Sequence, residues 1–361
     1  MLATRRLLLS FLLVLFVAVG VCQNNPPQTA PVPPDSFELV TGATQVPSTP
    51  EERSAVLALM ERARQNGDLH AAGSAAYTMR VTFNASGNVL ATGAGEMEET
   101  WFSPANARWT AHLGDFSLDR IFSSGRVFDD KIADFIPIRL QTLRSAIFWP
   151  INFQQGHTLI RTAVVTWKGK ELTCALISGE MADPSPTPGR RWEEREFCIE
   201  NKTGLLQILS DAPGVYVLFD YANALHFHGR VLPSQFKVVE GGNTVLESHL
   251  ESIADAISGP DSLTPSAQMK TNGPGPLLGG TMRFPRMVPV APGAATVQPV
   301  IVHAILDRHG KVGDAELVGN PDSALGQSAL EFVKRGLYPQ VERVWAGHQM
   351  EAFINVEFVS R

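Results

Sequence analysis

Hydrophobic and polar residues alternate with a period of two through most of the middle of the chain. Gly, Asn and Pro separate the alternating runs at the spacing expected for antiparallel strands. The predicted strands are 76–83, 95–102, 108–113, 158–167, 171–177, 191–199, 205–209, 215–221, 232–239 and 244–253. The pattern therefore predicts one extensive antiparallel sheet.

Two segments beside these strands have helical spacing instead. Pro50, Glu51 and Glu52 suit the first turn of a helix that ends at Asn66-Gly67. The buried face of this helix is predicted to be Val56, Leu57, Met60 and Ala63. Apolar residues at mixed spacing over 135–149 predict one or two short helices. Together with the strands, these helices indicate a strongly curved sheet wrapped around helices.

The C-terminal part of the chain repeats the change of period on a smaller scale. Strands are predicted over 297–307 and 311–318, and a final strand over 350–358. Between the second and the final of these strands, Asn320 or Asp322 can cap a helix that ends at Gly336. The buried stripe of that helix is predicted to be Leu325, Ala329, Leu330 and Val333. The predicted order is strand, strand, helix, strand.

Two acidic residues, Asp307 and Asp314, flank two glycines where the first two of these strands meet. A calcium loop needs oxygen ligands at alternate positions, and His309 occupies the second of them. A phosphate loop needs a strand that leads into a helix, whereas a strand follows here. We therefore predict a structural hairpin in which Gly310 supplies a positive φ.

The ends and the linkers give the domain organisation. Arg5 and Arg6 precede an apolar run, 7–21, which is shorter than the roughly 20 residues that a membrane span needs. We predict a secretory signal cleaved near Gly20 or Cys22, with a retained inner-membrane anchor as the alternative. The predicted parts are a signal peptide (1–22), a Pro-rich tether (23–50), an antiparallel β domain (51–257), a Pro/Gly/Ser linker (258–279) and a C-terminal domain (280–361).

Composition and charge narrow the class of protein. Hydrophobic content is 44%, charged content is 18% and the formal net charge is −6. No basic stripe with interleaved aromatic residues is visible in the sequence, so we expect no nucleic-acid partner.

Cys174 and Cys198 remain as a pair once the signal has been removed. In an oxidising compartment they are expected to form a disulfide. Strand alternation argues against it, because Cys174 shares a face with Leu172 and Leu176, whereas Cys198 shares a face with glutamates. Two unpaired cysteines therefore stay open as the alternative.

Several signals with a catalytic appearance do not form a site. Ser234 and Lys237 fit Ser-x-x-Lys, but Ser234 lies on a predicted strand, whereas that chemistry places the serine at a helix start. His226 and His228 share a strand face without a third ligand at metal-binding spacing, so we interpret them as surface residues. The charged run 190–196 is interpreted as a solvated strand face. We predict no enzyme, no cofactor and no metal.

Two turn motifs of the β domain carry a resemblance. Residues 201–205 read Asn-Lys-Thr-Gly-Leu, and residues 229–233 read Gly-Arg-Val-Leu-Pro. Residues 51–257 thereby resemble the LolA-like superfamily of lipoprotein carriers and periplasmic lipid-binding proteins. The resemblance implies a half-barrel whose concave face holds acyl chains. No ligand residue can be carried over to this sequence.

Residues 280–361 resemble the TonB C-terminal domain. The matches are Phe284-Pro285, Val302-x-x-x-Leu306-Asp307-x-x-Gly310-x-Val312, Ala329-Leu330 through Tyr338-Pro339, and Gly347. Phe284 departs from the tyrosine of that family. The resemblance implies that the last strand is a sheet edge that pairs with a partner protein. That edge would present Glu351, Phe353, Asn355 and Glu357, with Phe353 as its apolar contact; the alternative is that residues 281–296 cover Phe353.

The sequence thus predicts an α+β protein: a LolA-like half-barrel with helices, followed by a small ββαβ TonB-like domain. The expected function is a non-catalytic adaptor of the bacterial envelope whose partner is another envelope protein, such as an outer-membrane transporter. One alternative is a periplasmic carrier of lipid or lipoprotein acyl chains. Another is a membrane-anchored energy transducer of the TonB type.

Overall fold

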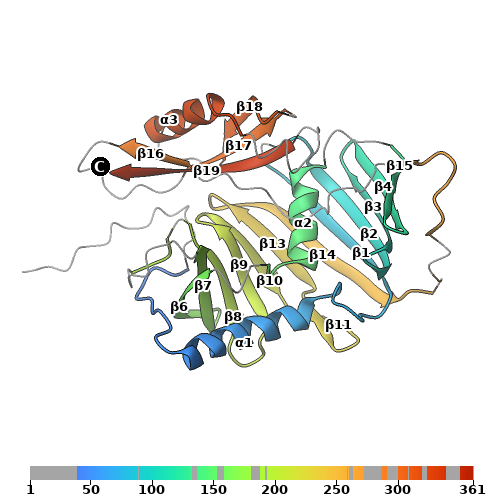
Figure 1. The fold of residues 1–361 in the computed structure, drawn as a ribbon, viewed down its shortest axis with the longest axis horizontal. Helices are drawn as coiled ribbons and strands as arrows, with labels where there is room; N and C mark the ends of the chain where they lie inside the picture. Colours follow the sequence, from blue (N-terminus) through green and yellow to red (C-terminus); the bar gives the residue numbers. More distant parts are fainter. Residues whose placement is uncertain are drawn as a thin grey trace, which may run out of the picture. The chain divides into compact units, whose positions relative to one another are not determined.

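Thirteen strands of the described residues form one antiparallel sheet, shown in Figure 1. The structure is a computed structural model that describes residues 39–87, 89–131, 136–152, 158–179, 188–191, 193–257, 259, 263–271, 286–290, 300–307, 309–318, 323–338 and 350–360. The predicted signal peptide and most of the tether lie outside the described residues.

The strands of this sheet agree with the alternating pattern in most places. They are β1 (Tyr77–Ala85), β2 (Gly93–Ser103), β3 (Asn106–Leu113), β4 (Phe116–Ser123), β5 (Arg126–Asp129), β6 (Thr158–Trp167), β7 (Lys170–Gly179), β8 (Arg195–Glu200), β9 (Leu206–Ala212), β10 (Val215–Asp220), β13 (Gln235–Glu240), β14 (Asn243–Asp255) and β15 (Lys270–Thr271). Every predicted strand of the β domain is confirmed. The sequence pattern missed β4, β5 and β15, and also a separate short hairpin, β11 (Leu225–Phe227) with β12 (Arg230–Leu232).

The order of the strands places chain segments far apart in sequence side by side. The order is β15-β5-β4-β3-β2-β1-β14-β13-β10-β9-β8-β7-β6. Strand β1 therefore pairs with β14, and Val81 lies opposite Leu250. Strands β1 to β5 form the early half of the sheet, and strands β6 to β10 with β13 form the later half. Strand β14 lies between β1 and β13 and joins the two halves.

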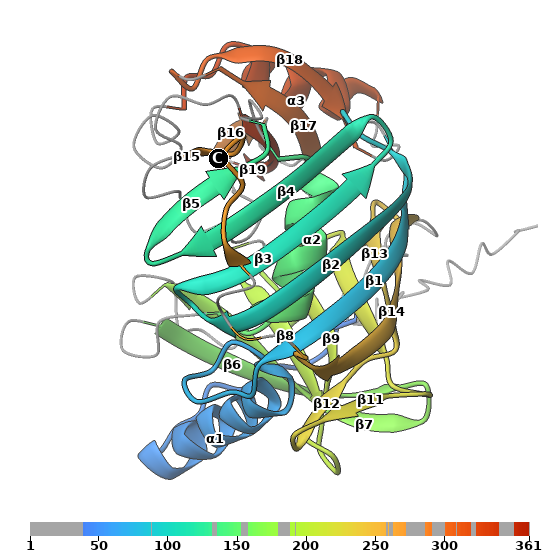
Figure 2. The ribbon, with the colours of Figure 1, turned by 90° about the vertical axis from the view of Figure 1, so that its right-hand side faces the viewer.

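Two helices pack against this sheet. Helix α1 (Pro50–Gly67) begins with a complete capping box, in which the Thr49 hydroxyl accepts from Glu52 N at 3.2 Å and Glu52 Oε2 accepts from Thr49 N at 3.3 Å. Both predicted ends of α1 are confirmed. Helix α2 (Ile138–Phe148) confirms the predicted helical insertion, and Figure 2 shows it between the two halves of the curved sheet.

The main hydrophobic core fills the space between α2 and the sheet. From the early half it contains Met79, Val81, Phe83, Met97, Trp101 and Trp109; from the later half Phe197, Ile199, Leu209, Val217, Phe236 and Val238. Alternation of side chains along each strand directs these residues to one face of the sheet. We call this surface the inner face.

The C-terminal part forms a four-stranded sheet with one helix. Its elements are β16 (Arg286–Val290), β17 (Val300–Leu306), β18 (Val312–Leu317), α3 (Ser323–Lys334) and β19 (Met350–Ser360). The hairpin prediction is confirmed: Gly310 has φ 77°, and Asp307 Oδ1 accepts from His309 N and Lys311 N at 2.8 and 2.9 Å. A Cβ on Gly310 would lie 1.9 Å from Tyr338 O, so packing also requires glycine at this position.

The predicted linker is more structured than its composition indicates. Leu263 is buried, and Lys270 and Thr271 of β15 pair with Asp129 and Phe128 of β5. The described part of this segment therefore contains a buried residue and a paired strand, and the assignment of 258–279 as an interdomain linker stays a prediction. Apolar burial and strand pairing outweigh the Pro/Gly/Ser composition here, and residues 35–361 form a single compact unit.

Candidate functional site

Helix α2 is the element that occupies the inner face. Nine of its eleven residues are buried, which leaves only Thr142 and Ser145 partly exposed. A helix that is buried nearly all round has to be enclosed by the protein, and its buried polar side chains need partners there. The sheet encloses it from both halves, since its residues pack in the same core as strands β1–β3 and β8–β13.

Two buried ion pairs attach α2 to the two halves of the sheet. Arg139 donates from Nη1 and Nη2 to the carboxylate of Glu240 on β13, at 2.6 and 3.0 Å. Arg144 donates from Nη1 to Glu99 Oε2 on β2, at 2.7 Å. Breaking a buried pair of this kind by removing one partner costs about 3–5 kcal/mol. The pairs therefore fix the position of α2 along the inner face.

The second pair belongs to a cluster of aromatic and charged side chains. We define this aromatic–arginine cluster as His70, Tyr77, Glu99, Trp101, Trp109, Arg144, Phe148 and Trp149. The guanidinium of Arg144 lies over the ring of Trp109 at 4.3 Å and over the ring of Phe148 at 4.9 Å. His70 stacks on Phe148 with 4.4 Å between ring centroids. The stacking compensates for part of the cost of burying a cation.

Glu99 is the acidic centre of this cluster and is 1% exposed. Its Oε1 accepts from Tyr77 Oη at 2.6 Å and lies 2.8 Å from His70 Nε2. Burial alone would raise the pKa of Glu99, but Arg144, His70 and Tyr77 together outweigh it and lower that pKa to about 2. Burial, and then the charge of Glu99, raise the pKa of Tyr77 well above its usual value. Glu99 is thus a carboxylate and Tyr77 a neutral donor at neutral pH.

The N-terminus of α2 is held by the C-terminal sheet. Glu351 of β19 accepts from Ile138 N through Oε2 at 2.7 Å, and from Leu90 N through Oε1 at 3.0 Å. His303 Nε2 of β17 lies 2.7 Å from the same Oε1. Pro137 is at the N-cap position and makes no side-chain hydrogen bond to the helix. Glu351 therefore supplies the acceptor that a helix N-terminus requires.

These contacts correct the prediction of a free partner-binding edge. The C-terminal sheet has the order β16-β19-β17-β18, so β19 lies between two strands and is not an edge. Glu351, Phe353 and Asn355 are 1%, 5% and 3% exposed, and the side chain of Glu357 lies outside the described residues. Sequence alternation placed these residues on the solvent side, but that side is a second packed face.

Phe353 contributes an apolar contact within the protein. It clusters with Ile138 of α2 and Ile301 of β17, and its ring centroid lies 5.5 Å from Arg139 Cζ. The alternative cover by residues 281–296 falls largely outside the described residues; the described part, β16, lies beside β19 as a parallel strand. Of the residues predicted to bind a partner protein, Glu351, Phe353 and Asn355 are therefore buried inside the same chain.

The opposite face of the later half carries a second group of buried charges. Arg161 donates from Nε and Nη2 to Glu194 at 2.6 and 2.7 Å, and Arg190 lies 3.5 Å from Glu196. The prediction of a solvated charged strand face is wrong, because Glu194 and Glu196 are fully buried. Arg161 and Arg190 neutralise them, and backbone from 40–45 and 189–191 covers the pairs.

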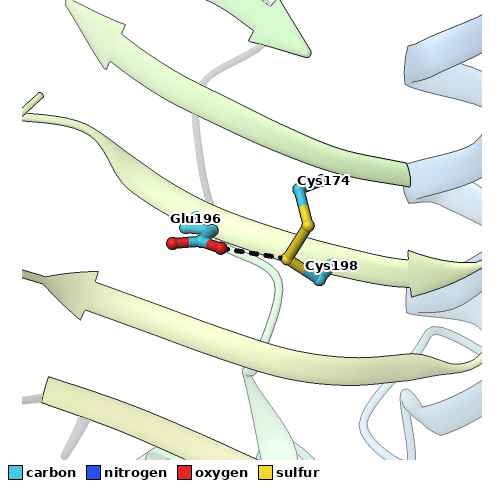
Figure 3. Close-up of side chains that lie close together, drawn as sticks. All are labelled: Cys174, Glu196 and Cys198. Atoms are coloured by element: carbon cyan, nitrogen blue, oxygen red, sulfur yellow. Dashed lines mark hydrogen bonds between the residues drawn. A yellow bond between two sulfur atoms is a disulfide. The ribbon is translucent and has the colours of Figure 1, made fainter. Parts of the chain in front are cut away.

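The two cysteines lie on this same face. Cys174 of β7 and Cys198 of β8 are directly opposite in register, and their sulfurs are bonded at 2.04 Å (Figure 3). No bulge separates them. The sequence argument against the disulfide was that Cys174 shares a face with leucines and Cys198 with glutamates. Both can share one face because the glutamates are buried as ion pairs on the same side as Leu172, Leu176 and Ile208.

Glu196 approaches the disulfide closely. Its Oε1 lies 3.1 Å from Cys198 Sγ, the contact dashed in Figure 3. Since a disulfide sulfur carries no hydrogen, this is a van der Waals contact. Within the described part of the chain, these three residues are the one group of His, Cys, Asp or Glu with ligand atoms within 4.8 Å of one another. A metal would need thiolates, which the disulfide does not offer.

The remaining residues singled out in the sequence lie apart from the inner face. Ser234 Oγ donates to Asp220 O at 3.4 Å, whereas Lys237 pairs with Glu247 at 2.6 Å. His226 and His228 are exposed, as predicted, and His228 lies 2.6 Å from Asp255 Oδ1. These residues therefore do not form a common site.

No protein-family model and no curated protein matches this chain. Similar solved structures include a LolA superfamily protein from Nitrosomonas europaea, with 10% identity and TM-score 0.36 over 58% of this chain and 97% of the other. A putative outer membrane lipoprotein-sorting protein domain from Vibrio parahaemolyticus has 6% identity and TM-score 0.33 over 55% and 92%. LprF from Mycobacterium bovis has 10% identity and TM-score 0.23 over 60% and 99%.

None of these three structures is TonB-like, and the TonB resemblance of residues 280–361 stays a prediction. Among the described residues, no helix is long and apolar enough to cross a membrane. Because all three TM-scores lie below 0.5, the inner face itself has to carry any functional conclusion.

Proposed function

We propose that the protein is a non-catalytic lipid-binding protein of the bacterial envelope that holds acyl chains on the inner face of its curved sheet. The observation that carries this proposal is the burial of α2 on an apolar face to which both halves of the sheet contribute. The adaptor function expected from a free β19 edge is not proposed, because that edge is paired and buried.

The chemistry of the inner face suits hydrocarbon. The core residues of β1, β8, β10 and β13 that surround α2 are mostly Val and Phe. Each methylene group of an acyl chain that leaves water for such a surface contributes about 0.8 kcal/mol. The predicted signal peptide and the disulfide between Cys174 and Cys198 fit a protein of an oxidising envelope compartment.

The two ends of α2 differ in how firmly they are held. Glu240 and Glu351 bind the N-terminal end through Arg139 and Ile138 N. At the C-terminal end, Trp149 and Pro150 are partly exposed. We therefore place the path of an acyl chain at the C-terminal end of α2, where Phe148 and Trp149 separate solvent from the inner face.

The proposal is tested by titrating the purified full chain with a fluorescent fatty-acyl probe. Saturable binding is expected, with faster amide hydrogen exchange over 145–149 and unchanged exchange over 138–141. Trp149→Ala should weaken binding about threefold to tenfold, because an apolar contact is lost. Trp167→Ala is the matched control. Trp167 packs against the cluster that contains Leu172, on the face of the sheet opposite the inner face, so this variant should leave the affinity unchanged.

Two results would reject the proposal. One is the absence of saturable binding to a correctly folded chain. The other is equal weakening by Trp149→Ala and Trp167→Ala, which would indicate a general loss of packing rather than a path beside α2.

A further inference from the structure

Two buried donors inside the aromatic–arginine cluster have no hydrogen-bond partner among the residues that the structure describes. They are Trp109 Nε1 and Arg144 Nε, in side chains that are 1% and 5% exposed. Both belong to one stacked pair, because Arg144 Cζ lies 4.3 Å from the centroid of Trp109. Buried donors without acceptors are rare in native proteins, and each calls for a water, an ion or a ligand atom that accepts.

Arg144 differs from the other buried arginines in how its donors are used. Arg120 and Arg161 each give Nε and Nη2 to one carboxylate. Arg139 donates from both terminal nitrogens to Glu240. Its Nε has no partner among the described residues, but both terminal nitrogens of its guanidinium are already bonded to a carboxylate. Arg144 gives only Nη1 to Glu99, and its Nη1 also lies 3.7 Å from Met97 Sδ. Its Nε edge is therefore available to another acceptor.

The charges of the cluster select the kind of acceptor. The carboxylate of Glu99 already balances the guanidinium of Arg144. A second carboxylate at Arg144 would bring a like charge close to Glu99 in a buried region, which is strongly unfavourable. A neutral carbonyl oxygen accepts hydrogen bonds without this repulsion. The site therefore favours an ester or amide carbonyl over a free acid.

We infer that Trp109 and Arg144 form a binding site for the carbonyl oxygen of an esterified acyl chain. The inference rests on the proposed function and names its class of ligand. The carbonyl oxygen accepts from Trp109 Nε1 and Arg144 Nε, while the hydrocarbon lies along the apolar inner face. Phe148 and Trp149 border the path to this site. Their ring centroids lie 4.9 and 6.0 Å from Arg144 Cζ.

The test compares two phospholipids with the same headgroup and the same chain lengths, one ester-linked and one ether-linked. The ether lacks the carbonyl oxygen and is otherwise closely similar. The full chain should bind the ester about fivefold to tenfold more tightly, as expected for one or two hydrogen bonds. Affinities are measured by displacement of the fluorescent acyl probe.

Two variants remove the donors separately. Trp109→Phe keeps an aromatic ring under Arg144 but lacks the N–H, and Arg144→Lys keeps a cation for Glu99 but lacks Nε. In each, the ratio of ether to ester dissociation constants should fall towards one. Trp167→Phe, on the outer face, is the control and should keep the ratio of the unaltered chain. The thermal midpoint of each variant shows whether it is folded, and either variant alone suffices for the test.

Each outcome has a distinct meaning. Equal affinity for ester and ether in the unaltered chain overturns the inference, because water alone then satisfies the donors, while acyl binding itself still stands. A retained ester preference in both folded variants overturns it as well. If neither lipid displaces the bound acyl probe, the inference is overturned, while acyl binding itself still stands; if the probe itself does not bind, the proposed function fails and the inference falls with it.

Discussion

At the scale of single residues, Glu99 carries the most unusual electrostatics of the inner face. Its pKa is about 2 in the folded chain, against an ordinary value of 4.5. A lowered carboxyl pKa stabilises the fold above the unfolded-state value, and this contribution is lost as the pH falls from about 4.5 towards 2. The contribution at neutral pH is on the order of 3 kcal/mol.

The corresponding prediction concerns Glu99→Gln. The variant should be less stable than the unaltered chain at pH 7 by about 3–5 kcal/mol, because Arg144 is left buried without its counter-ion. The difference between the two proteins should shrink as the pH falls from 4.5 towards 2. Urea unfolding at several pH values measures both free energies. A difference that is constant from pH 7 to pH 2.5 would contradict the assigned pKa.

Trp109 and Arg144 show what sequence reasoning could not reach at this scale. His70, Glu99, Trp109 and Arg144 come from four separate segments, and no spacing in the sequence links them. Local signals performed better: Pro50, Glu51 and Glu52 indicated the start of α1, and Gly310 indicated the hairpin. Glu194 and Glu196 were misjudged because charged side chains are normally exposed unless a partner neutralises them. For Glu194 that partner is Arg161, which is distant in the sequence.

At the scale of elements, β19 joins the C-terminal sheet to α2. Alternation along 350–358 predicted the strand correctly but not its neighbours, because a period of two does not distinguish a solvent face from a second packed face. The parallel pairing of β16 with β19 has no local signal either, since a long connection separates the two strands. The prediction of a sheet edge was therefore wrong about the neighbours of β19, whereas the strand itself was predicted correctly.

The prediction at this scale is made for Glu351→Gln. The amide can still accept one hydrogen bond, but it loses the charge that favours the N-terminus of α2, so a destabilisation of about 1–3 kcal/mol is expected. Amide exchange of 138–141 should accelerate. Glu331→Gln is the control, because Glu331 of α3 forms an exposed pair with Arg335, which follows the helix. Unaltered exchange of 138–141 in Glu351→Gln would show that Glu351 does not hold α2.

At the scale of the whole molecule, the disulfide connects β7 and β8 near one end of the large sheet. Its cysteines are separated by 24 positions, for which the chain-entropy model gives a stabilisation of roughly 3 kcal/mol. The double variant Cys174→Ala/Cys198→Ala should lower the free energy of unfolding by about that amount. Because both cysteines are fully buried, a reductant should act on the native chain only through transient opening.

Thiol labelling with and without denaturant measures this protection. After brief treatment with a dithiol, labelling of Cys174 and Cys198 is expected only when urea is present. Rapid labelling of both cysteines in the absence of urea would show that this half of the sheet opens easily, contrary to its burial.

The pairing of β1 with β14 also affects how the protein is made. The early strands β1 to β5 leave the ribosome first and can pair with their sequence neighbours through short turns. The other edge of β1, with Tyr77, Met79 and Val81, has no partner until residues 243–255 have been synthesised. A growing chain therefore carries an open strand edge while residues 86–242 are synthesised, and such edges promote aggregation. The nascent protein is expected to depend on a holding chaperone until its fourteenth strand is available.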